Sequence, residues 1–409
     1  MKMKSRNAFL LLPYLLTNIE ASDSSSNNVR GPTKQRISPY QRIYGTENAA
    51  VHAERHRIET ESTHYLRTGL HSDPDFYLDQ YDPVMRKRRL QGNVMETFDG
   101  SFFEPLRITM VTDHLETRRS VVTEDQVDFI VNTILPRMSK FWSETLNVLP
   151  VGTREGVKNM PLKIDNSKLM QQKYCGDMEF TAVPTEHIVD GVENTDLILY
   201  VSGEPSARFC GPSTLAVAVA CNFDEQDRPT AGAINFCLDQ IELDRNGGAH
   251  ESVIQDNVDV AIHEAAHVLG MSSNSYKFFR DENGKALTPR VNGGFQKALA
   301  ECVNGETKQE VIPAETTLKL LTADNGQRYA TIVTPKVQAV VRNHFNCMDL
   351  DGAQLENQPT GNSCTGDHWD ERLFYPESLS GVISPTSVIL SPLSKCSILY
   401  STKLCPFFC

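Results

Sequence analysis

The chain has 409 residues, 40% of them hydrophobic and 22% charged, and this ordinary composition excludes a mini-protein, a collagen-like or coiled-coil fibre and a disordered chain. Its formal net charge of −12 is uneven: residues 1–89 carry 14 Lys and Arg against 10 Asp and Glu, whereas residues 90–409 hold the remaining 26 basic and 42 acidic residues. The acidic main body lacks the sustained basic face that a phosphate backbone needs, so nucleic-acid binding is excluded.

The first 22 residues have the order typical of a secretory signal peptide. Three basic residues precede an apolar run from Ala8 to Leu16, and the small residues Ala21 and Ser22 follow it. A buried N-terminal helix is the alternative. No later stretch reaches the roughly 18 apolar residues that span a bilayer, so we expect no transmembrane span, while membrane association stays open.

Residues 23–89 precede the first regular apolar pattern and are predicted to form a pro-segment. Residues 23–50 are rich in Ser, Asn, Gly and Pro, which is typical of loosely attached chain. The polar stretch that follows ends in four consecutive basic residues, Arg86 to Arg89. In a secreted chain this run predicts a processing site that frees a mature chain near Leu90, although a solvated charge run explains it equally well.

Residues 100–237 alternate between strand and helix patterns. A helix is predicted over 127–142, where apolar residues recur at helical spacing. Strands are predicted over 106–112, 197–201, 215–221 and 231–237, the last of them as an edge strand. This order of strand, helix and further strands leads into the segment that carries the chemistry.

Residues 258–270 contain two histidines four positions apart in a helix-favouring apolar stretch. At 100° per residue, His263 and His267 lie about 40° apart on one helical face, so both imidazoles can reach one Zn²⁺ at about 2.0–2.1 Å. Glu264 lies one step round the helix, where a base for a zinc-bound water is needed. The H-E-x-x-H pattern predicts a zinc site, because two histidines and a glutamate in a buried apolar helix otherwise lose hydration without compensation.

The ends of this helix are also predicted. Asp256 or Asn257 is expected to cap its start with a side-chain oxygen. Gly270 is expected to supply a left-handed stop.

A catalytic zinc needs a third protein ligand and keeps a fourth position for water. Downstream of the helix the chain has two histidines, His344 and His368. His344 has the helical spacing of a surface or packing residue. His368 follows a stretch rich in Gly, Asn and Ser, residues 361–367, and this loop setting lets it swing onto a metal. The residues therefore favour His368 as the third ligand.

All ten cysteines lie at or after Cys175, and no two of them are spaced as C-x-x-C. This wide spacing argues against a zinc ribbon or a thioredoxin-like site. It favours disulfide bonds formed in an oxidising compartment, with a connectivity that the spacing does not reveal.

Motifs spread over residues 105–384 resemble those of leishmanolysin-type peptidases, a group of the metzincin zinc endopeptidases. The matching segments are Leu106–Ile108, Arg228–Cys237, the zinc helix, Tyr276–Asp281, Thr334–Val337, His344–Cys347 and Asp367–Arg372. Most metzincins place the third histidine six residues after the second. This family interposes a long insertion and takes its third ligand from an H-W segment, so the resemblance implies zinc ligation by His263, His267 and His368.

The resemblance implies an α+β, metzincin-like fold with a twisted mixed sheet over the active-site helix. The implied catalytic domain, 90–384, has an N-terminal subdomain to about residue 271, an insertion over 272–360 and a third-ligand region over 361–384. Residues 385–409 stand as an atypical tail, in which the family's closing helix and cysteine-rich domain are missing. The chain is therefore expected to be truncated, with an incomplete C-terminal subdomain.

The resemblance also implies a secreted or cell-surface metalloendopeptidase with one catalytic zinc ion, acting on proteins or peptides. Glu264 is expected to accept a proton as zinc-activated hydroxide attacks a peptide carbonyl, and to return it to the leaving amine. The alternative is a weak or inactive homologue that acts as an extracellular adhesion or binding protein. A purely structural zinc site is disfavoured, because three histidines leave a coordination position open. Neither substrate preference nor oligomeric state follows from the residues.

Three departures from the family pattern bear on activity and anchoring. The predicted pro-segment has histidines between residues 52 and 64 but lacks the cysteine that caps zinc in family pro-segments, so thiol-based latency is not expected. Leu379 stands where the methionine of the metzincin turn falls, and this volume-conserving change is tolerable at under about 1.5 kcal/mol. Lys395 and Lys403 interrupt the C-terminal apolar residues, which argues against a GPI signal.

Overall fold

The computed structural model describes most of the chain beyond residue 102. The described residues are 103–151, 160–169, 173–176, 181–206, 208–211, 214–281, 284–360, 363–382 and 390–401. The predicted signal peptide, pro-segment and basic run lie outside the described residues. Among the described helices, none is long and apolar enough to cross a membrane.

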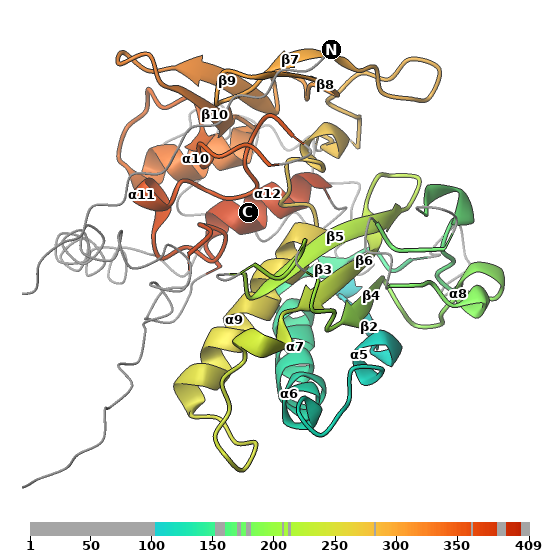
Figure 1. The fold of residues 1–409 in the computed structure, drawn as a ribbon. Coiled ribbons are helices and arrows are strands. Elements are labelled where there is room, and N and C mark those ends of the chain that lie inside the picture. Colours follow the sequence, from blue (N-terminus) through green and yellow to red (C-terminus); the bar gives the residue numbers. More distant parts are fainter. Residues whose placement is uncertain are drawn as a thin grey trace, which may run out of the picture. The chain divides into compact units, whose positions relative to one another are not determined.

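A four-stranded mixed sheet forms the centre of the N-terminal half (Figure 1). Its spatial order is β2 (Ile108–Val111), β4 (Leu197–Ser202), β6 (Pro229–Phe236) and β5 (Ala216–Phe223). β2, β4 and β6 run parallel, and β5 pairs antiparallel with β6. Every residue of β4 and β6 is buried. This mixed sheet, together with the helices below, agrees with the predicted α+β class.

The prediction that residues 231–237 form an edge strand is wrong. β6 lies between β4 and β5, and the edge position belongs to β5. The small residue Gly232 at the centre of β6 leaves room for a helix. A Cβ atom on Gly232 would lie 2.4 Å from Val268 Cγ1, so only glycine allows the zinc helix to approach the strand this closely.

Helices pack against this sheet and against each other. The helix predicted over 127–142 comprises α6 (Glu124–Phe129), a π-helical turn (Ile130–Ile134) and α7 (Leu135–Thr145). The zinc helix α9 (Glu251–Val268) contacts α7 and the strands β5 and β6. Figure 1 shows α9 and α7 lying side by side next to the sheet. The main hydrophobic core fills this interface, and Trp142 is one of its two largest fully buried side chains.

Several short elements complete this half of the chain. They are β1 (Glu104–Pro105), β3 (Asn147–Val148), α5 (Asp113–Glu116) and α8 (Thr185–Val189), with 3-10 helices at Asn166–Lys168, Leu238–Gln240 and Tyr276–Phe278. β1 and β3 pair antiparallel with each other.

The predicted insertion contains two small antiparallel sheets and a helix. The first sheet pairs β7 (Ala298–Glu301) with β8 (Thr307–Glu310), and the second has the order β11 (Ala353–Gln354), β10 (Arg328–Ile332) and β9 (Leu318–Thr322). α10 (Pro335–His344) follows β10, and α11 (Glu371–Phe374) follows the expected H-W segment. The insertion therefore ends in a strand, β11, that leads directly toward the third predicted ligand.

A helix occupies the segment in which the sequence analysis expected no closing helix. α12 (Pro392–Ser401) packs against α10. Its buried residues Leu393, Cys396 and Ile398 belong to the main core cluster. The tail thus contains a helix that the sequence analysis did not predict, and its apolar side chains share one core cluster with Val337, Val341 and Trp369.

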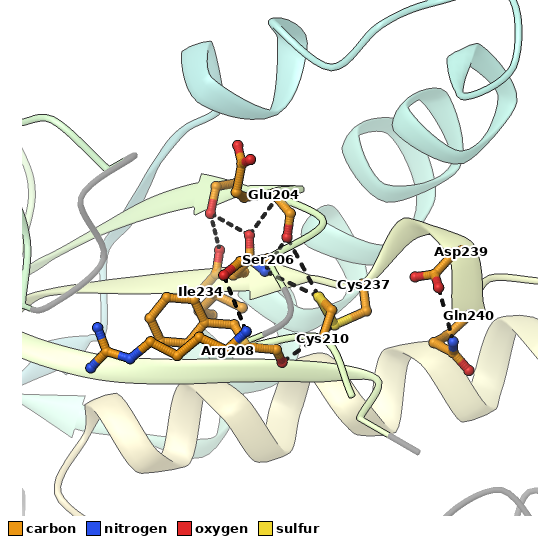
Figure 2. The surroundings of a disulfide bond; sticks show 11 residues. Glu204, Ser206, Arg208, Cys210, Ile234, Cys237, Asp239 and Gln240 are labelled. Carbon is orange, nitrogen blue, oxygen red and sulfur yellow. Dashed lines mark hydrogen bonds between the residues drawn. A yellow bond between two sulfur atoms is a disulfide. The ribbon is translucent and has the colours of Figure 1, made fainter. Parts of the chain in front are cut away.

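Three disulfide bonds lie within the described residues, which agrees with the expectation from cysteine spacing. They join Cys175 to Cys221, Cys210 to Cys237 and Cys302 to Cys364. Figure 2 shows how the second bond ties the loop after β4 to the residue that follows β6. Among the described cysteines, Cys347 is free.

Candidate metal centre

The zinc helix begins earlier than predicted. α9 starts at Glu251, with His250 at the N-cap position, where its ring nitrogen accepts a hydrogen bond from the Ser252 amide. Asp256 and Asn257 lie within the helix, so the prediction that one of them caps its start is wrong. The start at Glu251 was not predicted, because the first turns of α9 are polar and lack the apolar spacing of the later turns. Gly270 has a φ of 119°, which confirms the predicted left-handed stop.

Three histidine rings converge at the end of this helix. The Nε2 atoms of His263 and His267 lie 2.9 Å apart. His368 Nε2 lies 3.1 Å from the first and 3.2 Å from the second. The structure thus brings together the three predicted ligands, which form a group suited to a metal ion.

His344 lies elsewhere, as predicted from its helical spacing. It is the last residue of α10, and its ring packs edge-to-face on Phe345 with centroids 4.6 Å apart. A second ring contact joins His344 to Phe374. It takes no part in the group of three histidines.

Each of the three rings is anchored through its other nitrogen, Nδ1. The partner of His263 Nδ1 is the Ser378 carbonyl at 2.7 Å, and that of His267 Nδ1 is the Met271 carbonyl at 2.6 Å. His368 Nδ1 faces a carboxylate oxygen of Glu356 at 2.8 Å. All three partners are acceptors, so in a neutral ring Nδ1 carries the proton and Nε2 presents a lone pair. When all three rings are neutral, three lone pairs about 3 Å apart repel one another unless a cation lies between them.

The donor set fits a zinc ion. Ligands at about 2.0–2.1 Å in a tetrahedron lie about 3.3–3.4 Å from each other. The observed separations of 2.9–3.2 Å are slightly tighter than this and leave no protein atom between the rings. Neutral imidazoles whose Nδ1–H groups bind carbonyl or carboxylate oxygens are the usual zinc-binding form of histidine.

Burial and neighbouring charges shift the pKa values of the three rings in different directions. Burial lowers the pKa of His263 well below its usual value and lowers that of His267 to about 4, and the neighbouring rings add to both effects. Burial also opposes charge on His368, but the Glu356 carboxylate and its hydrogen bond raise the pKa of His368 to about 9. Two rings are therefore ready to bind a metal at neutral pH, and the third must first release a proton.

Glu264, the predicted base, is buried on α9 with 7% of its surface exposed. Burial raises the pKa of Glu264 to about 8, while the nearby charge of His368 acts to lower it and that of Asp367 to raise it. A divalent cation beside the three rings would further favour the carboxylate form.

Glu356, which no sequence pattern marked, binds the third predicted ligand. Its carboxylate accepts from His368 Nδ1 and from the amides of Asp367 and His368. Glu356 lies twelve residues before His368 at the end of the insertion, and a single glutamate there has no local signature. The Ser378 and Met271 carbonyls were missed for the same reason, because backbone groups leave no trace in a sequence.

The turn that carries Leu379 lies against the histidines. Ser378 supplies the carbonyl that holds His263, and Leu379 is fully buried. Two residues later, a Cβ atom on Gly381 would lie 3.1 Å from the His368 ring. Residues 378–381 therefore contact both His263 and His368, so Leu379 lies in a turn that supports two of the predicted ligands.

Comparison with known proteins gives one family. The family model described as leishmanolysin matches residues 113–394. The chain is 28% identical over 366 residues to a leishmanolysin-like peptidase of Caenorhabditis elegans, covering 79% of this chain and 49% of that protein. It is 28% identical over 325 residues to the Drosophila melanogaster leishmanolysin-like peptidase, covering 70% and 45%, and 26% identical over 290 residues to the Crithidia fasciculata leishmanolysin homolog, covering 69% and 35%. The chain spans about half the length, or less, of these curated relatives.

Proposed function

The chain belongs to the leishmanolysin family of peptidases, and from this premise we propose that it is a zinc metalloendopeptidase that hydrolyses peptide bonds in proteins. The observation that carries the proposal is the convergence of three imidazole Nε2 atoms, with the buried Glu264 close enough to interact electrostatically with His368. Its substrates are proteins or peptides, in keeping with the names of its relatives.

Each site residue has a distinct task in this proposal. His263, His267 and His368 hold the zinc ion through Nε2. When bound, Zn²⁺ acts as a Lewis acid and lowers the pKa of its bound water toward 7. The Glu264 carboxylate takes a proton from the attacking water and returns it to the leaving amine nitrogen. Burial raises the pKa of Glu264 to about 8 without a metal, and a bound divalent cation would lower it toward the neutral range, which suits a group that must both accept and release a proton.

The ligand set supports a catalytic rather than a structural zinc. Structural zinc sites are closed by four protein ligands, whereas catalytic sites use three and keep one position open. Within the described residues, no fourth His, Cys, Asp or Glu joins the group formed by the three histidines. Glu264 lies on the same helix without belonging to that group, which suits a base better than a ligand.

We further propose that the protein acts outside the cell or at its surface. The three disulfides are typical of oxidising compartments. Residues 1–22 serve as signal peptide and residues 23–89 as pro-segment in this proposal. N-terminal sequencing of secreted material tests both: a start near residue 90 supports the pro-segment, and a start near residue 23 contradicts it.

A second candidate function rests on Leu379. If the methionine of this turn is needed for turnover, the chain is a zinc-binding homologue that acts by adhesion or by binding other proteins. The two candidates differ in turnover, since both retain the metal centre.

Casein hydrolysis by the zinc-loaded full chain separates them. The peptidase proposal expects hydrolysis that 1,10-phenanthroline abolishes. It also expects Glu264→Ala to bind one zinc ion per chain and to lose turnover by about 10²–10⁴-fold. Stoichiometric zinc without cleavage of casein or gelatin would favour the binding protein instead, and unchanged turnover in Glu264→Ala would refute the role of Glu264.

A further inference from the structure

The third ligand is held by an unusual concentration of hydrogen bonds on one atom. Glu356 Oε1 accepts from His368 Nδ1 at 2.8 Å, from the Asp367 amide at 3.0 Å and from the His368 amide at 3.2 Å. The carboxylate thus binds both the ring and the backbone of the same histidine. Since Glu356 is 16% exposed in its side chain, these bonds are largely shielded from competing water.

The backbone of Glu356 is fixed to the same segment. The Glu356 amide donates to the His368 carbonyl at 2.9 Å, and the Asp370 amide donates to the Gln354 carbonyl at 3.1 Å. Leu355 and Trp369 form a bridge between these two bonds. Residues 354–356 and 368–370 therefore pair as short antiparallel strands. This pairing corrects the expectation that His368 swings freely on a loop.

Two glycines make room for this arrangement. A Cβ atom on Gly366 would lie 2.1 Å from Glu356 Cγ, and its three nearest atoms all belong to the Glu356 side chain. A Cβ atom on Gly381 would lie 3.1 Å from the His368 ring. The Glu356 side chain thus packs directly against Gly366, and the His368 ring packs against Gly381.

We propose that Glu356 is the positioning residue of the metal centre: its carboxylate fixes His368 with the proton on Nδ1, so that Nε2 presents its lone pair to the ion. This inference rests on the proposed zinc centre. His263 and His267 are oriented by a rigid helix and by carbonyl groups, whereas His368 lies beyond the long insertion and depends on a side chain. Glu356 therefore gives the insertion a function, which is to carry the support of the third ligand.

Zinc affinity, measured by competition with a chromophoric chelator on the full chain, tests the proposal without relying on turnover. Glu356→Ala removes the acceptor and is expected to weaken zinc binding by about 10–100-fold. Glu356→Gln keeps an oxygen acceptor and is expected to lose less than Glu356→Ala. The matched control is Glu310→Ala, because Glu310 also accepts from an amide of this region, that of Cys364, but does not touch His368. Its zinc affinity is expected to stay at the wild-type value.

A substitution at Gly366 provides a second, independent test that leaves the Glu356 carboxylate chemically unchanged. Gly366→Ala is expected to displace the Glu356 side chain and to weaken zinc binding to a similar extent. In the Glu356→Ala background the clash is gone, so adding Gly366→Ala is expected to cause no further loss. Equal, additive losses in both backgrounds would show that Gly366 acts independently of Glu356.

A spectroscopic reading separates positioning from a general loss of structure. In the zinc-loaded protein, ¹⁵N NMR of the histidine rings is expected to show a protected Nδ1–H on His368 that disappears in Glu356→Ala and persists in Glu310→Ala. Wild-type affinity and a protected His368 Nδ1–H in Glu356→Ala would overturn the proposal. If Glu356→Ala fails to fold, Glu356→Gln and Gly366→Ala carry the test. A wild-type chain that binds no zinc would instead overturn the proposed function.

Discussion

Glu377 and Ser391 connect the turn beneath the histidines to the last helix. One carboxylate oxygen of Glu377 accepts from both the amide and the hydroxyl of Ser391, each at 3.0 Å. The other oxygen accepts from the Leu379 amide at 2.5 Å. Ser378, which lies between Glu377 and Leu379, accepts a hydrogen bond from His263 Nδ1, so the segment that leads into α12 supports the proposed metal centre through one buried carboxyl group.

This carboxyl group predicts a pH dependence of stability. Burial raises the pKa of Glu377 to about 7, against the lowering effect of the bonds from Ser394, Leu379 and Ser391. A folded-state pKa above the unfolded value means that its contribution to stability is complete below about pH 4.5 and is lost as the pH rises through 7. Between pH 5 and 8 the wild type is expected to lose roughly 2–3 kcal/mol that Glu377→Gln does not lose.

Urea unfolding of the wild type and Glu377→Gln at each pH measures how their unfolding free energies differ. The other titrating groups are common to both proteins, so the difference reports on Glu377. If the unfolding free energies of the two proteins changed in parallel with pH, the raised pKa of Glu377 would be contradicted.

Ser394 supports the residue next to the third ligand. Its hydroxyl accepts a hydrogen bond from the buried Trp369 Nε1 at 2.9 Å. Ser394→Ala leaves that donor unsatisfied and also removes the hydrogen bond from Ser394 to Glu377, so we expect a loss of about 1–3 kcal/mol in unfolding free energy. Ser397 on the same helix is the control, since its buried hydroxyl has no hydrogen-bond partner among the described residues. Ser397→Ala is expected to cost nothing, and equal losses for the two variants would argue against the bond to Trp369.

Gly232 sets the distance between the central strand and the zinc helix. In Gly232→Ala the new methyl group would meet Val268 at 2.4 Å and the Val219 carbonyl at 2.7 Å. We expect a loss of about 1–3 kcal/mol from overpacking. Gly294→Ala is the control, because the nearest atom to its Cβ lies at 3.9 Å. Thermal unfolding of both variants measures this loss. A Gly232→Ala protein as stable as the control would show that α9 can move away from β6 without a loss of unfolding free energy.

Zinc binding is expected to release a proton. Charge and hydrogen bonding from Glu356 overcome burial and raise the pKa of His368 to about 9, so its ring is protonated at pH 7.5 in the metal-free protein. A ligand must give up its proton, so zinc affinity is expected to rise by about tenfold per pH unit up to pH 9. Calorimetric titration in buffers of different ionisation enthalpy is expected to show one proton released from His368 per zinc, and a further fraction of a proton from Glu264, whose pKa of about 8 the cation lowers. Release of none would mean that His368 is already neutral.

The sequence determined the parts of this protein that depend on local spacing. Four-residue spacing on one helix placed His263 and His267 together, and the helical spacing of His344 removed it from consideration. The strands over 106–112 and 197–201 followed from apolar runs. These features depend on neighbours within a few residues, so the chain itself specifies them.

Only the tertiary structure decided how distant segments meet. It placed β6 in the interior of the sheet, where Gly232 leaves room for Val268, 36 positions later, and no local pattern contains that partner. It also assigned Glu356, Glu377 and the carbonyl of Ser378 to the support of the histidines. A metal ligand's chemistry is readable from its residue type, but its orientation comes from hydrogen bonds between segments that the fold alone brings within 3 Å.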